Sequence, residues 1–267
     1  MSAKLQLHQF LSKTGKFASK LDIMDAIHDG MITVDDKVVT DARYQLNPNM
    51  RTVVYNGEVL SRVENIYIAL HKPMHNLCSR LNNSERSLKK RSVFEIVSKL
   101  NLPIKLEQSL FTVGRLDEDT TGLLLVTNDG DFCHKVINAG SHIPKVYLVT
   151  LRDELTDKQH RLLKDGVDIE LEEDGKFSTY HTRPAKLEID VQNRRILKIT
   201  IDEGKKRQIR SMFEAVGNEV VALCRISIGE LTLASLRLDV ADCVRLDERQ
   251  RLKIFGEEPV TKKKIFG

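Results

Sequence analysis

The chain of 267 residues is long enough to bury a sizeable hydrophobic core, and its length suggests about two domains. Lysine and arginine outnumber aspartate and glutamate by 42 to 38, which gives a net charge of +4 and permits a polyanionic partner without requiring one. No apolar run approaches the roughly 20 residues of a membrane-spanning helix, and no secretory signal opens the chain, so a cytoplasmic protein is predicted.

Cysteine usage argues against a disulfide framework and against a metal site. The four cysteines form no close pair, and no histidine lies beside them at metal-ligand spacing. We therefore expect reduced thiols that serve packing: Cys78, Cys133, Cys224 and Cys243.

The N-terminal 60 residues predict a helix, a second helix and a hairpin. Apolar residues within 7–11 lie on one face of a short helix, and Ser19 is placed to cap a second helix that ends at Gly30. The β-prone runs 32–34 and 37–39 flank two aspartates, which is typical of a hairpin turn. The first twenty residues contain lysines and no acid, which predicts RNA contact by Lys13, Lys16 and Lys20.

An acidic, hydroxyl-rich turn lies between two apolar runs in residues 111–130, FTVGRLDEDTTGLLLVTNDG. The pattern predicts strand, exposed turn and strand, and the run 123–126 is long enough for a buried strand. Loops on a rigid scaffold often carry catalytic side chains, although a solvated hairpin tip would have the same composition. The candidates in this turn are Asp117, Asp119, Thr120 and Thr121.

The segment G-R-L-D-E-D-T-T-G-L-L-L-V-T-N-D-G resembles the catalytic motif of the RsuA/RluB-type pseudouridine synthases, which modify ribosomal RNA. The resemblance implies that Asp117 is the essential carboxylate and that Arg115 fills the space vacated by the extruded base. The run K-V-Y at 145–147 resembles a second family motif and implies that Tyr147 packs on the target uracil with Lys145 beside it.

A third stretch, E-G-K-K-R-Q-I-R-S-M-F at 203–213, resembles the family motif in which a strand turns into a helix. By this resemblance Arg210 pairs with Asp117 and keeps it ionised, while Arg207 and Gln208 face RNA or support the turn. The full set of predicted RNA-binding residues is Arg115, Lys145, Lys205, Lys206, Arg207, Gln208, Lys13, Lys16, Lys20 and Lys72.

The resemblance also implies a domain order and an α+β fold. Residues 1–60 resemble an S-four-like RNA-binding domain, 61–65 form a linker, 66–240 form the catalytic domain, and 241–267 are a C-terminal extension with a basic tail. The catalytic domain is expected to have a mixed, mainly antiparallel sheet with flanking helices. It opens with a strand followed by His71-Lys72-Pro73, but the glycine and small residues usual in the family after Lys-Pro are replaced by 74–80.

Remaining elements follow from periodicity and turn signals. Helices are predicted over 93–100, 131–138 and 156–166, and a hairpin is predicted over 185–191 and 195–201. The stretch 153–174 has nine acids against three bases and is expected to face solvent away from RNA.

The predicted function is conversion of one uridine of ribosomal RNA to pseudouridine by a monomer that needs no cofactor or metal. The target is expected in ribosomal RNA or a pre-ribosomal particle, and D-T-T-G and A-V-G-N-x-V-V favour the family's small-subunit branch. Asp117 can act as nucleophile or as base, which the sequence does not separate. One alternative is a non-catalytic RNA-binding assembly factor. The other is a magnesium-dependent phosphotransferase of the haloacid-dehalogenase type, which the D-x-D-x-T-like run at 117–120 suggests.

Overall fold

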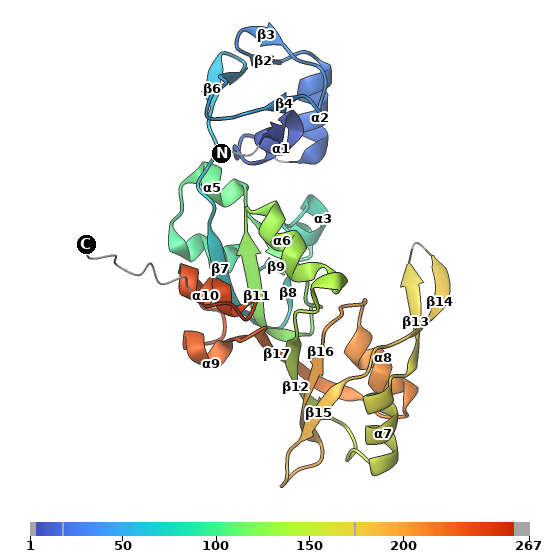
Figure 1. The fold of residues 1–267 in the computed structure, drawn as a ribbon. Helices are drawn as coiled ribbons and strands as arrows, with labels where there is room; N and C mark the ends of the chain where they lie inside the picture. Colours follow the sequence, from blue (N-terminus) through green and yellow to red (C-terminus); the bar gives the residue numbers. More distant parts are fainter. Residues whose placement is uncertain (1–3, 18, 174, 259–267) are drawn as a thin grey trace, which may run out of the picture. The chain divides into compact units, whose positions relative to one another are not determined.

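The structure is a computed structural model that describes residues 4–17, 19–173 and 175–258. The chain divides into two compact units (Figure 1). The first comprises Met1–Ile66, Leu100–Phe111 and Thr127–Asp129, and the second comprises Tyr67–Lys99, Thr112–Val126 and Gly130–Gly267.

The first unit packs two short helices with a four-stranded antiparallel sheet of order β3-β2-β5-β6. The side chain of Ser19 caps the second helix, as the sequence predicts, and forms a capping box with Asp22. Leu7, Phe10 and Leu11 are buried in the core of this unit. Its elements are β1 (Leu5–Gln6), α1 (Leu7–Ser12), α2 (Lys20–His28), β2 (Ile32–Val34), β3 (Lys37–Val38), β4 (Gln45–Leu46), β5 (Val53–Tyr55), β6 (Glu58–Leu60) and α5 (Ile104–Gln108).

The predicted hairpin in this unit is present, with Asp35 and Asp36 at its turn. Both residues have positive φ, 48° and 65°, which aspartate tolerates better than most residues. Two consecutive left-handed residues match the twist of a two-residue hairpin, so this turn forms without the stronger Asp-Gly pair.

The second unit contains a nine-stranded mixed sheet, in agreement with the predicted fold class. Its central path is β15-β16-β12-β17-β11-β7-β19, while β10 pairs with β11 and β18 pairs with β17. The pairing of β11 with β17 is parallel, and β17 runs antiparallel to β12. The strands are β7 (Tyr67–Lys72), β10 (Phe111–Val113), β11 (Thr121–Thr127), β12 (Lys145–Leu151), β15 (Lys186–Ile189), β16 (Ile196–Ile201), β17 (Val220–Ile228), β18 (Leu231–Thr232) and β19 (Cys243–Arg245).

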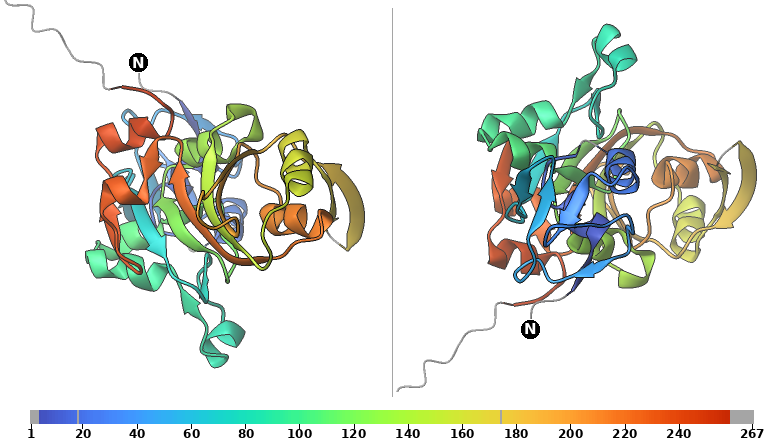
Figure 2. Two further views of the ribbon diagram at one scale, coloured as in Figure 1. Left: turned by 90° about the horizontal axis from the view of Figure 1, so that it is seen from below. Right: turned by 90° about the horizontal axis from the view of Figure 1, so that it is seen from above.

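Strand β11 lies in the interior of this sheet, and its residues from Gly122 to Thr127 are buried. A strand buried on both faces has a continuous apolar run, which explains the L-L-L-V sequence that predicted it. Short helices accompany the sheet (Figure 2). They are α3 (Asn83–Ser87), α4 (Phe94–Val97), α6 (Gly130–Ile137), α7 (Asp157–Asp165), α8 (Gln208–Ala215), α9 (Leu233–Leu236) and α10 (Glu248–Lys253). Helix α3 lies in the connection between β8 (Asn76–Leu77) and β9 (Arg91–Ser92), which pair with each other.

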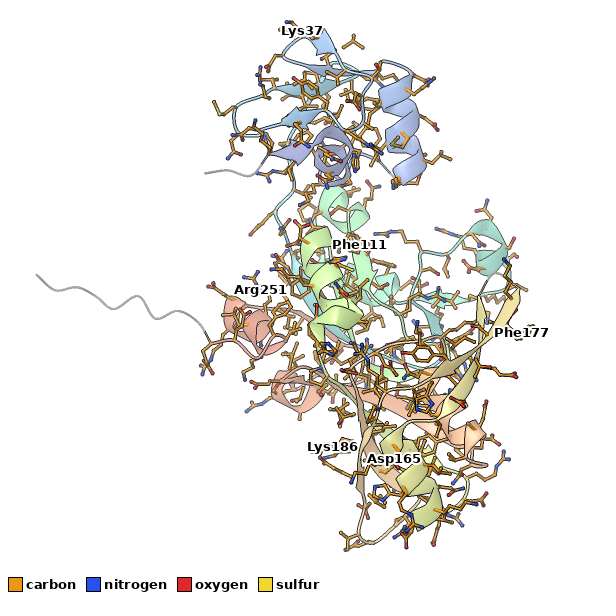
Figure 3. The ribbon with its side chains drawn as sticks, turned by 45° about the vertical axis from the view of Figure 1, so that its right-hand side comes forward. Lys37, Phe111, Asp165, Phe177, Lys186 and Arg251 are labelled. Atoms are coloured by element: carbon orange, nitrogen blue, oxygen red, sulfur yellow. The ribbon has the colours of Figure 1, made fainter. Side chains whose placement is uncertain are left out.

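A two-stranded hairpin of β13 (Asp168–Glu173) and β14 (Lys176–His181) was not predicted. Ile169 and Leu171 are buried, while Phe177 is 75% exposed at the projecting end (Figure 3). Polar residues alternate with these apolar residues, so the exposed acidic side of β13 agrees with the expectation that this stretch faces solvent.

Residues beyond Asp239 contribute to the second unit. Strand β19, placed by the sequence in a C-terminal extension, forms the edge of the nine-stranded sheet and pairs with β7. The predicted basic tail, Lys262–Lys264, lies outside the described residues. Among the residues that the structure describes, no helix combines the length and apolar character needed to cross a bilayer.

Candidate functional site

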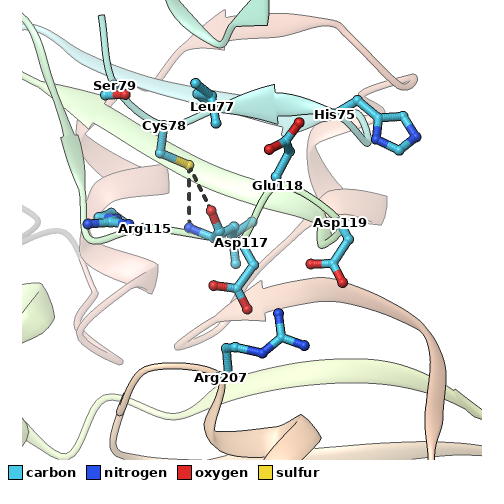
Figure 4. Close-up of a pocket in the computed structure, with 10 residues that line it drawn as sticks. His75, Leu77, Cys78, Ser79, Arg115, Asp117, Glu118, Asp119 and Arg207 are labelled. Atoms are coloured by element: carbon cyan, nitrogen blue, oxygen red, sulfur yellow. Dashed lines mark hydrogen bonds between the residues drawn. The ribbon is translucent and has the colours of Figure 1, made fainter. Parts of the chain in front are cut away.

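Asp117 lies in the turn between β10 and β11, at the rim of a pocket of about 550 Å³. The pocket is lined by this turn, by the segment that follows β7 and by the residue before α8 (Figure 4). Its volume is in the range of small-molecule sites, so it can admit one nucleotide base with its sugar. The lining residues are His75, Leu77, Cys78, Ser79, Arg115, Leu116, Asp117, Glu118, Asp119 and Arg207.

Lys72 binds the backbone of this turn and is not accessible to RNA. Its predicted role as an RNA contact is therefore corrected. The side chain is fully buried, and its ammonium donates to the carbonyl oxygens of Glu118 at 3.2 Å and Thr120 at 2.9 Å. A third bond reaches the carbonyl of Pro73 at 3.1 Å. Burial lowers the pKa of Lys72, and the nearby acidic groups oppose that shift. A buried ammonium needs such acceptors, which explains why the chain wraps around it.

The segment in which the sequence departs from the family pattern supplies further contacts to the turn. The Cys78 thiol donates to the carbonyl of Leu116 at 3.3 Å and accepts from its amide at 3.4 Å. The amide of His75 donates to the carbonyl of Glu118 at 2.8 Å. These bonds hold the residues on both sides of Asp117. Sequence reasoning missed them, and the unusual residues after Pro73 were the only signal.

Arg210 does not form the expected pair with Asp117. Its guanidinium lies 2.9 Å from the Asp119 carboxylate and donates to the Val220 carbonyl at 2.8 Å. The arginine is only 7% exposed. The physical reason is the shape of the turn, which directs Asp119, two residues after Asp117, toward the buried face of α8.

The carboxylate of Asp117 is left open to the pocket. Within the described parts of the chain it has no ion pair and no hydrogen bond through its side chain. The carboxylates of Asp117 and Asp119 and the guanidinium of Arg207 converge in the pocket (Figure 4). Arg207 precedes α8 with a left-handed backbone, φ 54°, a conformation that is rare for arginine and common at functional sites.

Gln208 is buried, at 3% exposure, so it is also corrected as a direct RNA contact. Its amide donates to the carboxylate of Glu203, which further accepts from the Tyr180 hydroxyl at 2.6 Å and the Arg183 amide at 3.0 Å. The hydrogen bond from the Tyr180 hydroxyl to Glu203 raises the pKa of Tyr180. Gln208 therefore supports the turn into α8, the second of the two roles that the motif allows.

Tyr147 and Lys145 lie together on β12, outside the residues that line the pocket. The Tyr147 side chain is 9% exposed, and the Lys145 ammonium donates to the Ile143 carbonyl at 3.0 Å. Burial, followed by the charge of Arg225, lowers the pKa of Lys145, and Asp202 opposes that shift. Half-burial leaves this lysine able to meet an acceptor that enters beside Tyr147.

The remaining predicted RNA contacts are exposed to different degrees. Lys205 lies 4.8 Å from the centre of the Tyr180 ring, and Lys206 is 3.8 Å from Glu172. Lys13, Lys16 and Lys20 belong to the first unit, where Lys16 pairs with Glu58.

The residues at the turn do not suit a magnesium-dependent phosphotransferase. The acidic side chains of this turn are not gathered around a common cation position, because Asp119 is paired with Arg210. Among the residues that the structure describes, no group of three or more histidine, cysteine, aspartate or glutamate side chains could hold a metal ion.

Comparison with known proteins gives matches over most of the chain. Residues 66–215 match the family model described as RNA pseudouridylate synthase. Ribosomal small subunit pseudouridine synthase A of Escherichia coli (strain K12) is 34% identical over 208 residues, 78% of this chain and 82% of the relative. Ribosomal large subunit pseudouridine synthase B of Bacillus subtilis (strain 168) is 33% identical over 244 residues, 90% of this chain and 92% of the relative. A crystal structure of a pseudouridylate synthase aligns with a TM-score of 0.62 and 27% identity, covering 94% of this chain and 99% of that one.

Proposed function

The chain belongs to the RNA pseudouridylate synthase family, and we propose that it isomerises one uridine of small-subunit ribosomal RNA without a cofactor. The observation that carries this proposal is the open carboxylate of Asp117 in a nucleotide-sized pocket, within a turn that Lys72 and Cys78 hold in place. Precise placement of one reactive group is the main requirement of an isomerisation that needs no external reagent.

Asp117 acts on the ribose in this proposal. As a nucleophile it would bond to C1′ while the glycosidic bond breaks, and as a base it would take the proton from C2′. Both routes need an ionised carboxylate. The guanidinium of Arg207, on the opposite side of the pocket, adds a positive charge to the site.

Tyr147 packs on the uracil after the nucleotide leaves its stack. Extrusion costs a few kcal/mol, and contact with an aromatic ring returns part of this cost. Arg115, at the pocket rim, takes the place of the extruded base, and Lys145 contacts the RNA beside Tyr147. Arg210 acts through Asp119, by fixing the turn that carries Asp117.

The choice of the small subunit rests on the motif details D-T-T-G and A-V-G-N-x-V-V, since the identities to the small-subunit and large-subunit relatives are nearly equal, 34% and 33%. The first unit, with its two helices and hairpin, serves as the S-four-like RNA-binding domain. The substrate is free ribosomal RNA or a pre-ribosomal particle in the cytoplasm, and the enzyme acts as a monomer.

The test is conversion of transcribed small-subunit and large-subunit ribosomal RNA by the full chain, in EDTA, followed by mapping of pseudouridine. We expect one modified position in the small-subunit transcript. Asp117→Asn should remove all conversion while RNA affinity is kept, because an amide is neither anion nor base. Asp239→Asn, at an exposed position, is the matched control. RNA binding without conversion by the wild type would support the assembly factor, and modification of the large-subunit transcript would reverse the choice of subunit.

A further inference from the structure

Arg225 lies in β17, between β11 and β12. In the sheet register it is opposite Gly122 on one side and Tyr147 on the other. Residues directly opposite one another on neighbouring strands project side chains from the same face of a sheet. The Arg225 side chain therefore stands beside Tyr147, the residue proposed to pack on uracil.

The residue opposite Arg225 on β11 has to be glycine. Gly122 has φ 110°, and a Cβ there would lie 2.3 Å from the Arg225 carbonyl oxygen. The close approach of β11 places Arg225 opposite Gly122, which lies five residues after Asp117 along the chain. The guanidinium uses its Nε to donate to the Leu123 carbonyl at 2.7 Å, which fixes the direction of the side chain.

The charge of Arg225 has no counter-ion among the residues that the structure describes. The residue is 4% exposed, and its Nη2 is buried without a hydrogen-bond partner. A second cation, Lys145, interacts electrostatically with Arg225 and lies on the same face of β12 as Tyr147, two residues before it. Buried charges are normally paired, because removing them from water is costly. Asp202 offsets part of the charge of Lys145, whereas the buried Nη2 of Arg225 remains a free donor beside the tyrosine proposed to bind the base, and such a donor is suited to an anion that forms there.

The proposed reaction generates such an anion. When the bond between N1 and C1′ breaks, its electron pair leaves with the uracil, and the negative charge spreads over N1 and the two carbonyl oxygens. The freed ring turns, C5 bonds to C1′ and loses its proton, and N1 gains a proton, so no atom or electron is lost overall. A backbone phosphate is a poorer candidate ligand, because it stays at the RNA surface, while the extruded base is the group that contacts Tyr147 in the proposed function.

We propose that Arg225 is a further catalytic residue, which donates a hydrogen bond from Nη2 to a carbonyl oxygen of the uracil beside Tyr147 and stabilises the detached uracil anion. Lys145 adds positive charge at the same place. Fixed donors directed at charge that develops in the transition state are among the largest contributions to catalysis. The inference rests on the proposed function, since it assigns a role in that reaction.

The test compares Arg225→Gln with the wild type in single turnovers at saturating enzyme. The substrates are small-subunit ribosomal RNA transcripts made with uridine or with 5-fluorouridine. Conversion is followed after digestion by the loss of the nitrogen-linked nucleoside, because both substrates break the bond between N1 and C1′, whereas C5 of 5-fluorouridine has no proton to lose afterwards. We expect a loss of about 100-fold on the uridine transcript, the cost of removing one such donor. Fluorine stabilises the departing uracil anion, so the loss should be clearly smaller on the 5-fluorouridine transcript, whereas purely structural damage would slow both equally.

Arg225→Lys tests the same role with the charge retained and should recover part of the rate. This variant also provides the test if Arg225→Gln folds poorly. Arg251→Gln is the matched control, because Arg251 also has a buried nitrogen without a partner but lies over the Tyr67 ring at 4.3 Å. Equal losses on both transcripts, or a loss that disappears at saturating enzyme, would overturn the inference. A wild type that forms no carbon-linked nucleoside would instead overturn the proposed function and the inference with it.

Discussion

The guanidinium of Arg210 pairs with the carboxylate of Asp119 at 2.9 Å, and Asp117, two residues earlier in the same turn, has no side-chain partner among the described residues. The arginine is therefore placed to fix the turn through Asp119 and not to pair with Asp117. An arginine held between a carboxylate and the Val220 carbonyl has little freedom to move toward Asp117.

The pair predicts a non-additive pattern of rate losses. Arg210→Ala should slow the chemical step by about 100-fold, since small displacements of a reacting group can have that cost. Asp119→Asn should cause a similar loss, and the double variant should be no slower than the worse single variant, because both changes remove one interaction. Single-turnover rates at saturating enzyme measure this.

Arg210→Lys should retain an intermediate rate, since lysine keeps the charge but loses the fork that also reaches Val220. Additive losses in the double variant would mean that the two residues act separately. An effect of Arg210→Ala only on RNA affinity would make it an ordinary RNA contact.

Lys72 gives a second prediction, which concerns stability. Lys72→Met keeps the length of the side chain but leaves the carbonyls of Pro73, Glu118 and Thr120 without their donor. We expect a loss of about 1–3 kcal/mol in the free energy of unfolding. The rate at saturating RNA should fall as well, because two of these carbonyls flank Asp119. Denaturant unfolding and single-turnover kinetics measure the two effects.

The dependence of RNA affinity on salt separates this structural role from phosphate contact. Lys72→Met should leave that dependence unchanged, because the ammonium is buried. Lys206→Met, at an exposed position, is the control and should flatten it without a comparable loss of stability. A flattened salt dependence in Lys72→Met would contradict the structural role.

The sequence predicted elements wherever the signal is local. Ser19 with Asp22 marks the start of α2, and the apolar run before Val126 marks β11, because capping and burial act over a few neighbouring residues. The hairpin of β13 and β14 was missed, since its second strand exposes Phe177 and most of its other side chains.

The sequence predicted which residues line the candidate site, but it did not predict which groups their side chains contact. Asp117, Arg115 and Arg207 do line one pocket, yet Lys72 and Gln208 are buried, although charge and polarity suggested RNA contact. The sequence does not distinguish a lysine that binds phosphate from a lysine that binds backbone carbonyls. Only the folded chain shows which acceptors come within reach.

Glu58 in the first unit predicts a response to acid. Its pairs with Lys105 and Lys16 lower its pKa from 4.5 to about 2. Because the folded value is the lower one, the stabilisation is complete above pH 4.5 and is lost as the pH falls toward 2. The melting-temperature difference between wild type and Glu58→Gln should therefore shrink over this window. Lys105→Gln should move the midpoint upward, and a difference independent of pH would contradict the pairing.

The lysines of the first unit give the last prediction, which tests whether this unit contacts RNA. The variant with both Lys13→Gln and Lys20→Gln should bind ribosomal RNA more weakly. Its plot of log affinity against log salt should lose about 0.9 in slope for each phosphate contact removed, or about 2 in total. Titrations of the transcript at several salt concentrations measure the slope.

Lys16→Gln is the matched control for this variant, because it removes one charge from the same unit and also breaks the pair with Glu58. The rate at saturating enzyme should stay near that of the wild type in all these variants, since the pocket of Asp117 is formed by residues of the second unit. An unchanged slope in the double variant would show that these lysines do not meet phosphate. A loss of rate at saturation would mean that the first unit also positions the target uridine, because electrostatic affinity alone has no effect once all the RNA is bound.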